Sequence, residues 1–90
     1  MNKYILKPSV DIEFKDNELY IIDGETGFVG TGNKCSYQVL DIIRHASTEV
    51  EIIEKLKTQY SESQYPRIEK SIPKIIEWAL EREIISICEE

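Results

Sequence analysis

The chain has 90 residues, a formal net charge of −6 and a hydrophobic content of 41%. This length suits a single domain spanning residues 1–90, and no apolar run approaches the ~20 residues that cross a bilayer. The acidic balance argues against a nucleic-acid partner, because proteins that bind phosphate backbones usually carry an excess of basic residues. The first eight residues lack the apolar stretch of a secretory signal. We therefore expect a cytoplasmic protein with no membrane partner.

The first third of the chain has the two-residue period of β-strands. Apolar and charged residues alternate over residues 10–14, which is typical of a strand with one buried face. Asp16 and Asn17 favour a two-residue turn into a second strand over residues 18–22. A glycine-containing turn then precedes a short third strand over residues 28–31. These segments predict a three-stranded antiparallel β-meander.

After Gly32 the apolar period becomes helical. Asn33 or Ser36 can cap a first helix, and Thr48 can cap a second helix that ends at Tyr60. The meander alone buries too little apolar surface to be stable, so it must pack on the helices. The sequence thus predicts an α+β fold of winged-helix type, with strands over about residues 9–31 and helices over about residues 33–82.

The start of the third helix depends on Pro73. The polar segment 61–64 predicts a loop, and the helix is expected to reach about Arg82. Proline cannot donate a hydrogen bond to the residue four positions back, so Pro73 must lie in the first turn or kink the helix. This favours a start nearer Glu69 or Ser71. Residues 84–87 are expected to form a short extended segment.

The sequence contains no recognisable catalytic or metal-binding motif. The one histidine, His45, is expected at the end of the first helix, where a cation complements the dipole. Cys35 and Cys88 are both expected to be small apolar core residues. The segment 27–34 is glycine-rich but departs from the phosphate-loop pattern, because Asn33 separates Gly32 from the lysine. We therefore expect no enzymatic activity, no cofactor and no metal.

Several local motifs resemble those of PqqD and the related recognition elements that bind leader peptides. The resemblance covers residues 8–87 and includes the alternating first strand, the apolar second strand before Asp23-Gly24, and an asparagine, Asn33, before the first helix. It continues in the second helix capped by Thr48 and in residues 80–85 at the end of the third helix. The chain departs from the family pattern at Gly32, His45-Ala46 and Glu83.

The resemblance implies a function in peptide biosynthesis. Family members bind the leader of a ribosomally made precursor as a fourth strand, in a groove between the third strand and the third helix. They present the precursor to a separate modifying enzyme such as a protease, a cyclase or a radical enzyme. Lasso-peptide and radical-enzyme pathways both fit a free-standing module of this length.

The residues themselves favour such a groove. A third strand at the edge of a meander has main-chain groups that an added peptide can pair with. At 100° per residue, a stripe containing Trp78 and three cations borders the apolar face of the third helix, which suits an aromatic anchor and an acidic leader. The candidate peptide-binding residues are Gly27, Phe28, Val29, Gly30, Thr31, Arg67, Ser71, Lys74, Ile75, Trp78 and Arg82.

A winged-helix domain that binds DNA or another protein is the alternative. Four glutamates in and just after the third helix oppose phosphate contact, and the sheet precedes the helices, whereas a DNA-binding wing typically follows them. The open edge could also pair with a second copy, so the expected state is a monomer or a weak dimer. The four glutamates are Glu69, Glu77, Glu81 and Glu83.

Overall fold

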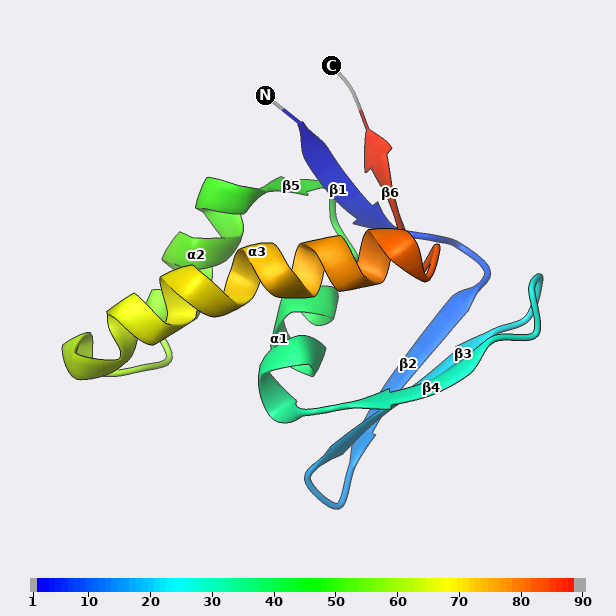
Figure 1. The fold of residues 1–90 in the computed structure, drawn as a ribbon, viewed down its shortest axis with the longest axis horizontal. Helices are drawn as coiled ribbons and strands as arrows, with labels where there is room; N and C mark the ends of the chain where they lie inside the picture. Colours follow the sequence, from blue (N-terminus) through cyan, green and yellow to red (C-terminus); the bar gives the residue numbers. More distant parts are fainter. Residues whose placement is uncertain (1, 89–90) are drawn as a thin grey trace.

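The computed structural model describes residues 2–88 as an α+β fold with two small antiparallel sheets and three α-helices (Figure 1). This agrees with the predicted fold class and with the predicted order of the meander and the three helices. The elements are β1 (Lys3–Leu6), β2 (Val10–Lys15), β3 (Glu18–Asp23), β4 (Val29–Gly32), α1 (Lys34–Ile42), β5 (Ser47–Thr48), α2 (Glu49–Lys57), the 3₁₀ turn η1 (Glu62–Gln64), α3 (Tyr65–Glu81) and β6 (Ile85–Cys88).

The predicted meander is the sheet β2-β3-β4. Lys15 pairs with Glu18, so Asp16 and Asn17 form a two-residue turn, and both have the positive φ that such turns require. Alternation along β3 places Leu19 and Ile21 fully inside the protein. Strand β4 continues the sheet on the far side of β3.

A second sheet, in the order β5-β1-β6, was not predicted. Strand β1 pairs with β6 along its length, from Lys3 opposite Cys88 to Leu6 opposite Ile85. The extended segment expected over residues 84–87 is therefore a true strand. Its partner, β1, begins at residue 3. Patterns among neighbouring residues cannot reveal a pairing between strands so far apart in the sequence.

The three helices and the inner faces of the sheets enclose one apolar core. Helix α2 begins with a capping box, in which Thr48 accepts the Glu51 N–H and the Glu51 carboxylate accepts the Thr48 N–H. Helix α3 packs on α1, α2 and β6. The buried apolar residues are Leu6, Val10, Leu19, Ile21, Val39, Leu40, Ile43, Ile52, Leu56, Ile68, Ile72, Ile76, Ala79, Ile84 and Ile85.

Helix α3 starts at Tyr65, and the expectation of a start nearer Glu69 or Ser71 was wrong. Pro66 lies in the first turn. Backbone N–H groups there have no intrahelical acceptor, so a proline at this position costs no helical hydrogen bond. Pro73 lies inside the helix but is exposed, as is Glu69 four residues before it. Water can therefore solvate this side of the helix, where the Glu69 carbonyl loses its donor.

The cysteines also differ from expectation. Cys88 is exposed on β6, and Cys35 is only half-buried in the first turn of α1. Both thiols are free. The prediction of two core cysteines was wrong because residue type alone does not fix the face of the element on which a side chain lies.

Candidate peptide-binding groove

Strand β4 is an open edge of its sheet. It pairs with β3 on one side, and no strand among residues 2–88 pairs with its other side. Asp23 donates its N–H to the Phe28 carbonyl, which identifies these two residues as a hydrogen-bonded pair. Hydrogen-bonded and non-hydrogen-bonded pairs alternate along an antiparallel ladder, so the N–H and C=O groups of Gly30 point toward β3. Val29 and Thr31 therefore direct their N–H and C=O groups toward the open side.

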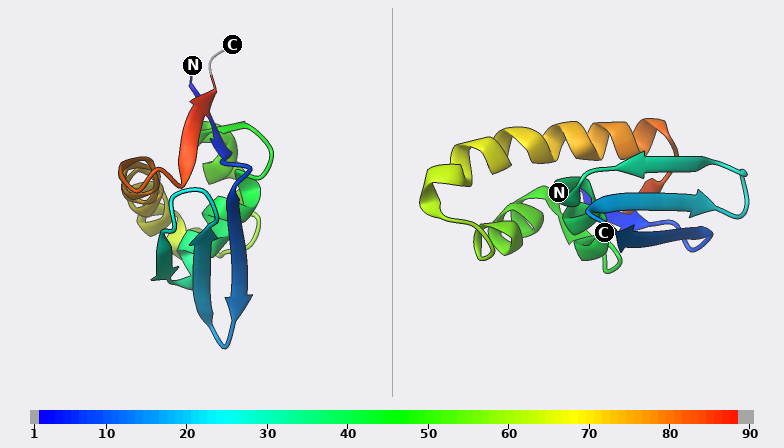
Figure 2. Two further views of the ribbon diagram at one scale, coloured as in Figure 1. Left: turned by 90° about the vertical axis from the view of Figure 1, so that its right-hand side faces the viewer. Right: turned by 90° about the horizontal axis from the view of Figure 1, so that it is seen from below.

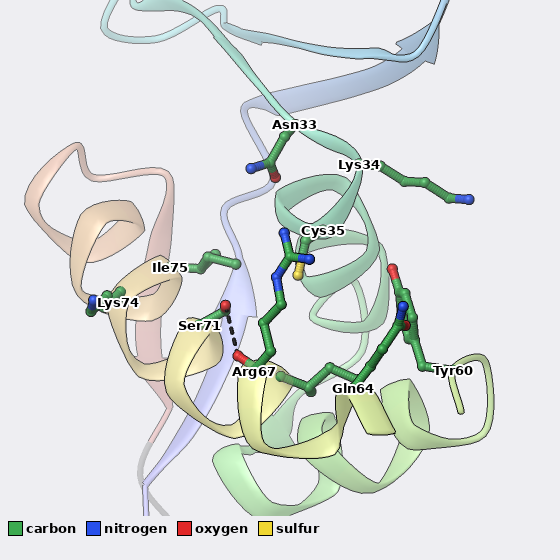
Figure 3. A pocket seen from close by; sticks show the side chains of 10 residues that line it. Asn33, Lys34, Cys35, Tyr60, Gln64, Arg67, Ser71, Lys74 and Ile75 are labelled. Atoms are coloured by element: carbon green, nitrogen blue, oxygen red, sulfur yellow. Dashed lines mark hydrogen bonds between the residues drawn. The ribbon is translucent and has the colours of Figure 1, made fainter. Parts of the chain in front are cut away.

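Helix α3 lies on the same side of the sheet as this open edge. Viewed from below, α3, β4, β3 and β2 follow one another across the molecule (Figure 2, right). Near the end of β4, the first turn of α1 and the first half of α3 enclose a groove of about 430 Å³. Its lining residues are Asn33, Lys34, Cys35, Tyr60, Gln64, Arg67, Ile68, Ser71, Lys74 and Ile75 (Figure 3).

Local hydrogen bonds hold the walls of the groove in place. Asn33 caps α1 through its Oδ1, which accepts the backbone N–H of Ser36 at 2.8 Å and the Ser36 hydroxyl at 3.0 Å. The Tyr60 hydroxyl donates to Gln38 on α1, which ties the connection after α2 to that helix. On α3, the Ser71 hydroxyl donates to the Arg67 carbonyl at 2.8 Å. The walls of the groove are thus built from α1, the α2–α3 connection and α3.

The groove is cationic and has no acidic residue in its lining. Lys34 of α1 and Arg67 and Lys74 of α3 contribute to the lining. Arg67 extends toward Cys35 across the groove (Figure 3). Burial raises the pKa of the Cys35 thiol, and the nearby Arg67 charge opposes that rise. The apolar component of the lining comes from Ile68 and Ile75.

The structure places the predicted site residues in three groups. Arg67, Ser71, Lys74 and Ile75 line the groove. Val29, Gly30 and Thr31 belong to β4. Gly27 and Phe28 lie between the preceding turn and β4, where the Gly27 N–H donates to the Asp23 carbonyl and the Phe28 N–H donates to the Thr26 hydroxyl. Trp78 and Arg82 lie farther along α3, beyond the groove, and Trp78 is half-buried against the core.

Six lining residues were absent from the sequence-based set. Lys34 could have been found, because a lysine directly after an N-cap opposes the helix dipole and therefore needs another explanation. Tyr60 could not, because its position depends on Gln38, which is 22 residues away in the chain. The six residues are Asn33, Lys34, Cys35, Tyr60, Gln64 and Ile68.

Two other features of residues 2–88 bear on function. The helices in this range are too short or too polar to cross a membrane. The same residues contain no group of three or more histidine, cysteine, aspartate or glutamate side chains placed to hold a metal ion.

Comparison with known proteins finds similarity in structure alone. No family model and no curated protein matches the chain. TbiB1 in complex with the TbiA(beta) leader peptide matches with a TM-score of 0.74 and 15% identity, covering 91% of this chain and 94% of that one. Lasso peptide synthetase B1 complexed with the leader peptide matches with a TM-score of 0.71 and 14% identity, covering 92% and 96%.

The heterocyclase TruD contains the same fold as a small part of a larger protein. The match has a TM-score of 0.70 and 17% identity, and it covers 98% of this chain but only 12% of TruD. The PqqD-like resemblance read from the sequence thus holds at the level of the fold. The chain has the fold of two proteins that are known in complex with a leader peptide.

Proposed function

We propose that this protein binds the leader peptide of a ribosomally synthesised precursor by strand addition along β4 and presents it to separate modifying enzymes. The observation that carries the proposal is the open edge of β4 beside the groove that faces α3. An extended peptide on this edge would pair with Val29 and Thr31 and place alternate side chains toward α3. Two proteins of the same fold contain a leader peptide in their structures.

In this proposal the protein is a binding module and takes no chemical part in the modification. The groove is lined by lysine, arginine, amide, hydroxyl, thiol and isoleucine groups, with no pair of carboxylates that would serve as general acid and base. Its function would be to raise the local concentration of the precursor at a protease, a cyclase or a radical enzyme. We propose that it acts in the cytoplasm as a monomer or weak dimer, in a lasso-peptide or radical-enzyme pathway.

Binding to DNA is the less favoured function. The chain has a net charge of −6, and several exposed glutamates are distributed along α3, the helix that would have to approach phosphates. A peptide added to β4 would not require those glutamates to contact phosphate groups.

A fluorescence-polarisation titration tests the proposal directly. The probe is the labelled leader segment of a small precursor encoded beside this gene, with a scrambled leader and duplex DNA as controls. We expect saturable binding of the leader alone, with micromolar or tighter affinity, which small interfaces reach. Binding of the DNA without the leader would overturn the proposal.

Two substitutions at one position test strand addition itself. Thr31→Pro removes an N–H group from the open side of β4 and leaves the ladder with β3 intact, because Thr31 bonds outward. Thr31→Ala keeps that N–H and removes the side chain. We expect Thr31→Pro to weaken leader binding at least about tenfold, the effect of losing about 1.4 kcal/mol, and Thr31→Ala to leave it almost unchanged. Equal affinities for the two variants would rule out main-chain pairing at Thr31.

A further inference from the structure

The cations of the groove have no acidic partner within the part of the chain that the structure describes. Lys34, Arg67 and Lys74 line one hollow whose lining contains no aspartate or glutamate, and no ion pair joins any of the three to a carboxylate in residues 2–88. All three side chains are exposed. In a protein with 17 acidic and 11 basic residues, a hollow whose charged lining residues are all cations is unexpected from composition.

The helix termini give a second, independent observation. Helix α2 follows the dipole rule, with Glu49 and Glu51 in its first turn and Lys55 and Lys57 in its last. The two helices that begin at the groove do the opposite. The first turns of α1 and α3 contain no acidic residue, and they carry Lys34 and Arg67 instead.

This arrangement costs stability in the free protein. The positive end of a helix dipole favours an anion and disfavours a cation. The N-termini of α1 and α3 and the cations Lys34, Arg67 and Lys74 therefore add positive charge at one hollow, whose lining contains no carboxylate. A bound anion would neutralise this charge, and the groove is roomy enough for a side chain at about 430 Å³.

We propose that the groove between α1 and α3 binds an aspartate or glutamate side chain of the leader peptide, held by Arg67 with Lys34 and Lys74 beside it. The inference rests on the proposed leader binding and names the chemistry that the groove selects. A carboxylate is the anion that a peptide supplies, and the planar guanidinium of Arg67 matches it in a bidentate geometry. Strand pairing along β4 would give general affinity, and the carboxylate would fix the register of the leader on that edge.

The experiment combines variants of the protein and of the leader in the same polarisation assay. Arg67→Gln, Lys34→Gln and Lys74→Gln each remove one groove cation, and Lys70→Gln is the matched control, because Lys70 is exposed on α3 but does not line the groove. We expect about 5–10-fold weaker binding for Arg67→Gln and about 3-fold for each lysine variant, typical of charge-assisted hydrogen bonds at a partly solvated site. Lys70→Gln should change affinity less than about 2-fold.

Changing each acidic residue of the leader to its amide then identifies the partner. One such change should weaken binding as much as Arg67→Gln does, and combining the two should add little, because both remove the same contact. Arg67→Lys should bind the leader more tightly than Arg67→Gln does. Added salt should weaken binding between the unmodified protein and leader more than binding between Arg67→Gln and the amide-substituted leader. All variants are checked for folding by circular dichroism.

The outcomes separate the two proposals. Leader binding that is sensitive to Thr31→Pro but insensitive to all three groove substitutions would overturn the carboxylate site and leave strand addition standing. Leader binding that stays unchanged when each acidic leader residue is replaced by its amide would also overturn the carboxylate site alone. Absence of any leader binding would overturn both proposals.

Discussion

The ring of Phe28 covers the α-carbon of Gly30, so that a β-carbon added to Gly30 would lie 2.7 Å from Phe28 Cζ. Gly30 faces inward opposite Ile21, and its missing side chain is the space that the Phe28 ring occupies. Phe28 in turn packs against the core. The geometry of the β4 edge therefore depends on a glycine whose φ is not positive.

Gly30→Ala should displace the Phe28 ring and destabilise the protein by about 1 kcal/mol, at the low end of overpacking because a side chain rather than the backbone has to move. Gly24→Ala is the control, since its nearest contact would be the Ser9 carbonyl at 3.8 Å. That variant should stay within about 0.5 kcal/mol of the original protein. Urea unfolding measures both, and equal midpoints would contradict the packing of Phe28 over Gly30.

Trp78→Ala is expected to weaken leader binding by about 1–2 kcal/mol if the indole anchors an apolar leader side chain. Trp78→Phe should recover part of the loss, and Tyr20→Ala, on the exposed outer face of β3, should have little effect. Trp78 is the one tryptophan of the chain, so its emission during a leader titration reports on this position directly. Unchanged affinity and unchanged emission would remove Trp78 from the site.

Pro73→Ala should stabilise the protein by about 1–3 kcal/mol. Alanine at this position supplies the N–H that proline lacks and can donate it to the Glu69 carbonyl, and its helix propensity is about 3 kcal/mol better. The site is exposed, so no packing is lost. Thermal or urea unfolding gives the difference. A loss of stability in Pro73→Ala would contradict this prediction and would mean that the local backbone of α3 favours proline over alanine.

Acid should destabilise the protein in part through Asp23. The carboxylate is buried at the end of β3, where its Oδ1 accepts the backbone N–H of Glu25 at 2.9 Å. The bonds from Glu25 and then from the Ser9 hydroxyl lower the pKa of the Asp23 carboxyl. Because the folded value lies below the unfolded value of about 4, this stabilisation is present above that pH and is lost as the pH falls through the folded pKa.

Glu51 contributes with the same sign, since the Thr48 N–H and hydroxyl lower the pKa of its carboxyl. Asp23→Asn should therefore remove only part of the decrease in unfolding free energy at acidic pH. Urea midpoints measured from neutral pH to about pH 3 test this, with Glu51→Gln as the complementary variant. An unchanged decrease in Asp23→Asn would show that Asp23 keeps an ordinary pKa.

Local chemistry made much of the fold predictable. The hairpin turn at Asp16-Asn17, the caps at Asn33 and Thr48 and the apolar face of α3 each depend on residues within a few positions of one another. The interior position of Pro73 was not predictable in this way, because tertiary packing of α3 outweighs the local cost of a proline. Local rules describe which elements form more reliably than where a well-packed helix begins.

The groove was only half predictable for the same reason. Arg67, Ser71, Lys74 and Ile75 follow from the angular spacing of one helix, and the structure brings them together at the hollow. The opposite wall comes from α1 and the segment after α2, and no spacing rule within a single element relates these to α3. Trp78 shares the helical stripe but does not line the same hollow.

The antiparallel pairing of β1 with β6 has a consequence for how this fold is joined to other chains. Lys3 lies opposite Cys88, and these two ends of the paired strands lie away from β4, on the other side of α3 (Figure 1). A polypeptide fused at either end would thus begin far from the open edge, and a short linker could join the two ends and allow the chain to be reopened at the Asp16-Asn17 turn. We therefore expect a fusion at either end, and a circular permutant opened at that turn, to keep the same affinity for a leader peptide.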